Sequence, residues 1–282
     1  MDEHNGKVKL REASVAGIFY PDEANVLEED LRRLLESAPE PRVHGAIAIA
    51  SPHAGYGYSG DLAALAWKSA LGRDVSQVLL LAPIHHPSES LIYLPEADYF
   101  DCPLGAIPVD RSLVEELRDC GTVFSMNDIP HFEEHGIEVQ LPFLRFLFPG
   151  ASIVPVLLGK PSPTAIKALA SGISIVFGEL KNSLIVLSVD LATNADPALA
   201  AVRSDRLLEA TSRGDWRAIL DLETRGETDS CGAGCLAAWL ASPLSAGFQS
   251  ELLGRHDSTA SRQSGDEPLV HYAALAWTKR RE

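Results

Sequence analysis

Positive charge is scarce in this chain. Its 282 residues include 24 lysines and arginines against 39 acidic residues, which gives a formal net charge of -15, and no basic run is visible. Nucleic acids and anionic membrane surfaces select for proteins with lysine-rich and arginine-rich faces. The composition therefore argues against both as partners.

Long apolar segments and cysteines are also few. The amino-terminal residues lack the apolar stretch of a signal peptide, and no run is long enough to span a bilayer. We therefore expect a cytoplasmic protein. The four cysteines are Cys102, Cys120, Cys231 and Cys235. They are too few and too scattered for a disulfide framework, so we expect them to be reduced.

Short apolar runs separated by amphipathic segments dominate what is present. With 46% hydrophobic residues, the chain can bury a large core, and we predict a single domain over residues 1–282. Runs of this length without polar alternation are typical of parallel strands that are buried on both faces. The predicted strands are 46–50, 78–82, 152–158 and 183–188, with shorter extended pieces at 91–94 and 105–109 and two closing strands at 248–253 and 269–277.

Helical spacing of apolar residues fills the intervals between these strands. This alternation predicts an α/β fold with right-handed crossovers. The predicted helices are 25–37, 60–71, 112–120, 163–180, 198–210, 216–222 and 231–240, and a polar loop is expected at 257–267.

Two turns that contain histidine follow the first two central strands. The segment Ser51–Tyr58 carries His53, and the segment Ala82–His86 carries His85 and His86. Ligands bind at the carboxyl ends of parallel strands in open α/β sheets. We therefore expect His53 and one histidine of the pair to face a shared crevice. Adjacent side chains diverge on an extended backbone, so only one of His85 and His86 is expected to bind an ion.

Two imidazoles leave a divalent metal ion incompletely bound, so a third ligand is required. Asp190 also follows a central strand, whereas Cys231 lies at the start of a predicted helix, where the helix dipole favours a thiolate. The residues alone leave five candidates open; they are Glu134, His135, Glu138, Asp190 and Cys231.

Seven motifs occur along the chain in the order seen in the Memo family, whose prokaryotic members are called AmmeMemoRadiSam system protein B. The chain resembles this family from Arg11 to about Trp277. The motifs are Arg11–Pro21, Pro52–Tyr56, Pro83–His86, Glu134–Pro142, Ile153–Val156, Ser188–Asp190 and Ser230–Gly232. The resemblance implies the fold of class III extradiol dioxygenases of the protocatechuate 4,5-dioxygenase type, a three-layer α/β/α sandwich around a mostly parallel sheet.

The same resemblance implies a ligand set and a metal. Carried over by motif, the metal ligands are His53, His85 and Cys231, which leaves Asp190, His86 and His135 as candidates for proton transfer. A thiolate with two imidazoles suits iron, copper or zinc rather than magnesium or calcium. We expect iron or copper, with zinc as the further possibility.

Two positions depart from the family pattern. Thr193 stands where many members have a histidine three residues after the aspartate, and Gln140 replaces another histidine. Both changes remove an imidazole, which weakens the case for oxygenase chemistry. They leave the three implied ligands in place.

The sequence therefore supports two main functions, with hydrolysis by a zinc ion as a third that ranks below the redox function. The first is a metal-dependent oxidoreductase that acts on an unknown small substrate. The second is a non-catalytic protein that uses the dioxygenase-like pocket to bind a peptide or small molecule. The family label also implies an association with radical-SAM and AMMECR1-like proteins.

Overall fold

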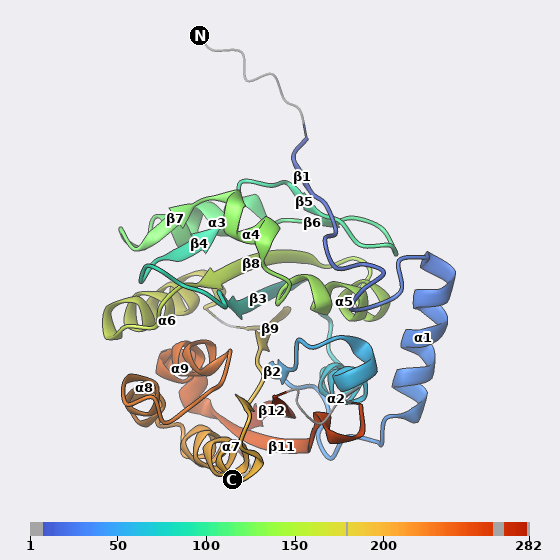
Figure 1. Cartoon of the computed structure of the whole chain (residues 1–282). Helices are drawn as coiled ribbons and strands as arrows, with labels where there is room; N and C mark the ends of the chain where they lie inside the picture. The colour runs from blue at the N-terminus through green and yellow to red at the C-terminus, as the bar shows by residue number, and fades with distance from the viewer. Residues whose placement is uncertain (1–7, 179, 262–267, 281–282) are drawn as a thin grey trace.

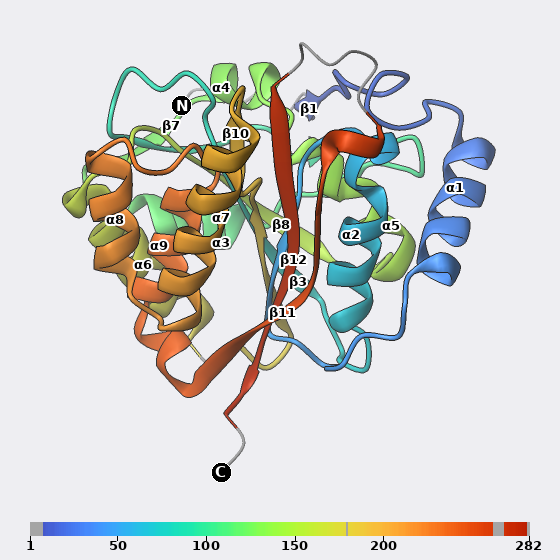
Figure 2. The ribbon, with the colours of Figure 1, turned by 60° about the horizontal axis from the view of Figure 1, so that its bottom comes forward.

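A central sheet with helices on both faces forms the body of the protein (Figures 1 and 2). The computed structural model describes residues 8–178, 180–261 and 268–280. In Figure 2, α1, α2 and α5 cover one face of the sheet, and α3 and α6 to α9 cover the other. The predicted α/β/α sandwich is confirmed.

The strands of the described part of the chain form two sheets. The larger has nine strands, in the order β10-β12-β2-β9-β3-β8-β4-β7 with β11 also paired to β12, and the smaller has the order β1-β5-β6. The strands are β1 (Leu10–Arg11), β2 (Ala48–Ser51), β3 (Gln77–Pro83), β4 (Ile92–Leu94), β5 (Tyr99–Phe100), β6 (Ile107–Pro108), β7 (Phe124–Met126), β8 (Ser152–Leu158), β9 (Ser183–Ser188), β10 (Ala192–Asn194), β11 (Phe248–Asp257) and β12 (Leu269–Lys279).

Helices connect most of these strands. The α-helices are α1 (Ala24–Ser37), α2 (Tyr56–Ser69), α3 (Arg111–Arg118), α4 (Asp128–Glu133), α5 (Leu141–Leu147), α6 (Pro163–Phe177), α7 (Pro197–Ser212), α8 (Trp216–Thr224) and α9 (Ala233–Ala241). Three short 3-10 helices are η1 (Glu138–Gln140), η2 (Pro243–Gly247) and η3 (Ser258–Ala260). Part of the loop predicted at 257–267 lies outside the described residues.

The large sheet is mixed, and the prediction of a mostly parallel sheet is wrong. Strands β2, β9, β3 and β8 run parallel to one another, but β12 is antiparallel to β2 and β4 is antiparallel to β8. Strand β11 pairs with β12 over a long antiparallel ladder, which needs no helical crossover. The parallel prediction therefore holds for the four central strands and for the pair formed by β4 and β7 at one edge of the sheet.

Those central strands are buried on both faces, as their apolar sequences predict. Every residue of β2 and β9 is buried, as are six of the seven residues in each of β3 and β8. The register sets Ile185 beside both Ala48 and Leu79. The carboxyl ends of β2, β9 and β3 consequently meet at one edge of the sheet, each followed by a polar residue.

Candidate metal centre

Three polar residues follow the carboxyl ends of adjacent parallel strands. His53 comes after β2, Asp190 after β9 and His85 after β3. Because β9 lies between β2 and β3, the three side chains are brought to the same crevice. The expectation that His53 and one histidine of the pair face a shared crevice is confirmed, because His53 and His85 line one cavity and their ring centroids are 5.2 Å apart.

The surrounding hydrogen bonds set which nitrogen of the His53 ring is the donor. The Ser188 hydroxyl donates to the Gly136 carbonyl over 2.7 Å, so it accepts the proton of His53 Nδ1 over 3.0 Å. The Gln140 amide donates to the same hydroxyl over 3.3 Å. His53 Nε2 therefore carries the lone pair, and this buried atom has no hydrogen-bond partner.

A carboxylate orients His85 in the same way. Glu134 accepts one hydrogen bond from the backbone N–H of His85 over 2.7 Å and a second from its Nδ1 over 2.6 Å. Donation of one ring N–H to a carboxylate is the usual support for a histidine that binds a metal through its other nitrogen. Glu134, one of the five candidate third ligands, is thus committed to His85.

His135 forms the third side of the histidine cluster. It follows the end of α4, and its ring stacks on His85 with centroids 4.6 Å apart and lies tilted against Phe19 at 4.7 Å. Burial, followed by the neighbouring His53 and His85, lowers the pKa of His135 to about 4, so the ring is neutral near pH 7. One ligand atom from each of His53, His85 and His135 lies within 4.8 Å of the others. This spacing fits a possible metal site.

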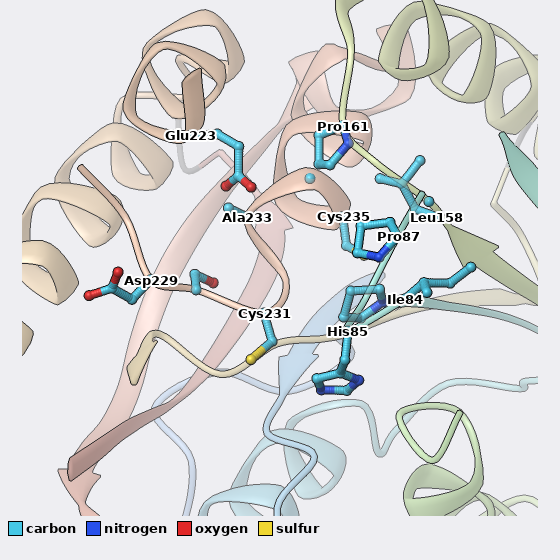
Figure 3. A pocket seen from close by; sticks show the side chains of 14 residues that line it. Ile84, His85, Pro87, Leu158, Pro161, Glu223, Asp229, Cys231, Ala233 and Cys235 are labelled. Atoms are coloured by element: carbon cyan, nitrogen blue, oxygen red, sulfur yellow. The ribbon is translucent and has the colours of Figure 1, made fainter. Parts of the chain in front are cut away.

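Cys231 approaches the cluster from the loop before α9. Figure 3 shows it beside His85 at the base of a cavity of about 240 Å³ that Cys235 and Glu223 also line. Burial alone would raise the pKa of the Cys231 thiol, but its interactions with His53 and His85 outweigh burial and lower the pKa to about 7. The interaction with Cys231, followed by Glu134, raises the pKa of His85 to about 10. Thiolate and imidazole thus stabilise each other's charged forms.

Asp190 supports His53 from the other side. Its Oδ1 accepts the backbone N–H of His53 over 3.1 Å, and its Oδ2 lies 3.7 Å from His53 Nε2. Burial raises the pKa of this carboxyl to about 7, although the hydrogen bond from His53 opposes the rise. Asp190 is placed to hold or release a proton next to the cluster.

A larger cavity of about 590 Å³ opens above the histidines. His53, His85, His135 and Asp190 form its polar end, and no lysine or arginine lines it among the described residues. The remaining wall is largely apolar and aromatic, and includes Phe19, Tyr58, Val270 and Tyr272. A cavity with these dimensions and this lining is typical of a small-molecule site.

Other predicted residues lie away from this cluster. The His86 side chain is exposed and lines neither cavity, so its role in proton transfer stays a prediction. Glu138 is fully buried, where it binds Arg11, Ser14 and Tyr20. It therefore holds the amino-terminal segment in place and is no longer a candidate for the third ligand.

The two positions that depart from the family pattern have different surroundings. Thr193 lines the larger cavity. The side chain of the next residue, Asn194, donates to Asp229 over 2.7 Å. Gln140 is buried, where it accepts from Trp67 and donates to the Pro52 carbonyl and to Ser188. Sequence reasoning missed the part that Gln140 and Ser188 play in orienting His53, although the position of Ser188 at the end of a central strand was a usable signal.

Comparisons with known proteins agree with the resemblance that the seven motifs indicated. A family model described as Memo-like protein matches residues 11–276. A MEMO1 family protein of Thermotoga neapolitana is 32% identical over 269 residues, which cover 91% of this chain and 95% of the relative. MEMO1 family proteins of Methanosarcina barkeri and Pyrococcus furiosus are 32% and 30% identical over 94% and 96% of this chain, and each match covers 99% of the relative.

Proposed function

Because this chain belongs to the Memo-like protein family, we propose that it holds a single iron or copper ion through His53, His85 and Cys231 and performs redox chemistry on a small molecule. We further propose that the reaction takes place in the cytoplasm. The described residues form no helix long and apolar enough to cross a membrane. The dioxygenase-like fold that the motif resemblance implies suggests dioxygen as the co-substrate.

The observation that carries this proposal is the buried, unpartnered Nε2 of His53. A buried polar atom without a partner costs free energy, and a metal ion would relieve that cost. Ser188 orients the His53 ring and Glu134 orients the His85 ring, each through Nδ1. The Cys231 thiol, whose pKa is lowered, interacts with both rings. These donors fit a metal ion that prefers nitrogen and sulfur.

The donor set narrows the choice of metal. Thiolate and imidazole favour copper, iron or zinc over magnesium and calcium. When bound, iron or copper would supply a redox couple and open positions for a small ligand. His135 has a neutral ring next to His53 and His85, two of the proposed ligands, so it is available as a further donor or as a proton acceptor.

The chain's own residues would bind the substrate and move protons. The cavity above the histidines has aromatic walls and no lysine or arginine among its described lining residues, which favours a small molecule without a large negative charge. Asp190 faces His53 Nε2 at 3.7 Å, so we assign it the transfer of a proton at the ligand end of the cavity.

Substitution of Cys231 tests the proposal. In Cys231→Ser, we expect iron or copper to be lost from the purified protein and dioxygen consumption to fall to the background rate. Cys120→Ser is the matched control, because Cys120 donates to the Glu116 carbonyl on α3, outside both cavities. Unchanged metal content and dioxygen consumption in Cys231→Ser would reject the redox function.

A second candidate function is the binding of a peptide or small ligand without turnover. The wide mouth of the larger cavity favours it, since Ile18 lies there with 76% of its surface exposed. Radical-SAM and AMMECR1-like proteins are the proposed partners. Their equal recovery in pull-downs with wild type and with the His53→Ala, His85→Ala double variant would favour a binding role independent of the metal.

Hydrolysis by zinc is a weaker alternative with the same ligands. Zinc also accepts two histidines and a cysteine, and it activates water in its open position. Metal analysis after anaerobic purification distinguishes this alternative, because it separates zinc from iron and copper.

A further inference from the structure

A cavity of about 730 Å³ lies at the opposite edge of the sheet from the histidines. Its walls come from the segment before β2, the turn between α2 and β3, the start of β9 and β11, and the carboxyl end of β12. All of these lie at the amino ends of the parallel strands or beside them. This cavity, which we call the basal cavity, therefore shares no residue with the metal centre.

The basal cavity is positively charged in a strongly acidic chain. Its described lining residues include Arg42, His44, Arg73, Lys181 and Lys279 but no aspartate or glutamate. His44 contacts Glu40 at 3.2 Å, so a carboxylate lies beside its ring. Arg42 and Lys279 are exposed, and neither has a carboxylate partner within the part of the chain that the structure describes. A local field of this sign attracts anions against the net charge of the chain.

Arg73 adds a fixed positive charge to the wall. Its guanidinium donates to the backbone carbonyls of Ala46 over 3.2 Å and Ser183 over 3.1 Å, and also to the carbonyl of Leu180. Carbonyl oxygens bear no net charge, so these bonds hold the side chain in place without cancelling its charge. Leu180 itself has φ of 50°, the one positive value for a non-glycine residue among those described.

Apolar side chains make up much of the remaining wall. Val43, Ile47 and Leu180 are buried, and Phe248 is partly exposed at the start of β11. Cations beside an apolar and aromatic surface suit a ligand with a phosphate group at one end and a flat ring at the other. The volume also falls within the range of roughly 300–1,000 Å³ that is typical of ligand pockets.

We propose that the basal cavity binds a nucleotide, with its phosphates beside Arg42, Arg73 and Lys279 and its base against Phe248. Inorganic polyphosphate shares the phosphate chemistry but lacks the ring. Nucleic acid is a different class of ligand, and it is disfavoured because the chain as a whole has a net charge of -15.

Isothermal titration calorimetry with ATP, tripolyphosphate and adenosine tests this proposal in buffer without added metal. For wild type, we expect ATP to bind more tightly than tripolyphosphate and adenosine to bind most weakly. Arg42→Glu with Lys279→Glu should weaken ATP binding at least about tenfold through the lost attraction and the new repulsion. The matched control is Lys167→Glu with Arg217→Glu, which changes the net charge equally at exposed positions on α6 and α8.

Further variants separate the parts of the site. Phe248→Ala should weaken the binding of ATP but leave that of tripolyphosphate unchanged, and His53→Ala with His85→Ala should leave both unchanged. Several results would overturn the proposal: absence of ATP binding at millimolar concentration, equal ATP affinity in the Arg42 and Lys279 variant and its control, adenosine binding as tightly as ATP, or binding of single-stranded oligonucleotides only.

Discussion

At the scale of single residues, the histidine cluster depends on partners that fix which ring nitrogen is free. Ser188 accepts the Nδ1 proton of His53, and Glu134 binds Nδ1 of His85 at 2.6 Å. Both rings can then present Nε2 to the shared space. These partners act on the histidines and so count as positioning residues.

Glu134→Gln should lower metal affinity while the fold is kept. The amide weakens the charged hydrogen bond to His85 Nδ1, and loss of such a partner typically costs about 10–100-fold in metal affinity. Competition with a chromophoric chelator measures the affinity. Glu133→Gln, an exposed neighbour, is the control. Equal affinities in the two variants would show that Glu134 does not position His85.

Only some residues of the site could be placed from the sequence alone. Short apolar runs placed His53, His85 and Asp190 at strand ends, because that inference needs only the order of elements. Cys231 could be assigned only by resemblance, because its position depends on how α9 docks against the sheet. His135 could not be placed in the cluster either, since it follows the six-residue helix α4 and no local pattern specifies its direction.

At the scale of elements, α9 brings Cys231 to the histidines through a close approach to β9. A Cβ added at Gly232 would lie 2.6 Å from Val189 Cγ2, 2.7 Å from Val189 Cα and 2.8 Å from the Ser188 carbonyl oxygen. Two of these atoms belong to the backbone, so the loop before α9 would have to move. The glycine therefore sets the position of its neighbour Cys231.

Gly232→Ala should consequently destabilise the protein by about 1–3 kcal/mol, the usual cost of overpacking, and reduce its metal content. Gly247→Ala is the control, because a Cβ there meets nothing within 4 Å. Urea denaturation measures the free energy of unfolding, and metal analysis of the same samples measures occupancy. Wild-type stability and metal content in Gly232→Ala would disprove the close-packing argument.

The start of α2 shows how a glycine misleads sequence reasoning about elements. The helix was predicted from Gly60 but begins at Tyr56, so Gly57 and Gly60 lie inside it. A Cβ at Gly60 would come within 3.1 Å of Leu34 on α1. Gly60 therefore permits close packing of two helices, a tertiary reason that has no local signature.

At the scale of the whole molecule, buried titratable groups couple stability to pH. Burial lowers the pKa of His131 to about 3, so the folded protein keeps this ring neutral where the unfolded chain protonates it. Burial alone would raise the pKa of Glu138. The charge of Arg11 and the hydrogen bonds from the backbone N–H groups of Ser14 and Val15 outweigh burial, so the pKa is lowered. Both groups bind protons more readily in the unfolded state, so their contributions to stability are lost as the pH falls.

His131→Gln should reduce this acid sensitivity. Glutamine can keep a donor to the Tyr93 carbonyl, which His131 Nε2 contacts at 3.2 Å, but it does not titrate. Between about pH 7 and pH 4, we expect the melting temperature of wild type to fall more steeply than that of the variant. Identical slopes for wild type and His131→Gln would contradict this account.

The metal content of anaerobically purified protein tests the central claim most directly. Mass spectrometry of the wild type should find iron or copper at a single ion per chain. His53→Ala, His85→Ala and Cys231→Ser should lose that ion, whereas His86→Ala, which removes the exposed neighbour of His85, should keep it. Wild-type protein without iron or copper, or equal metal content in His85→Ala and His86→Ala, would contradict the account.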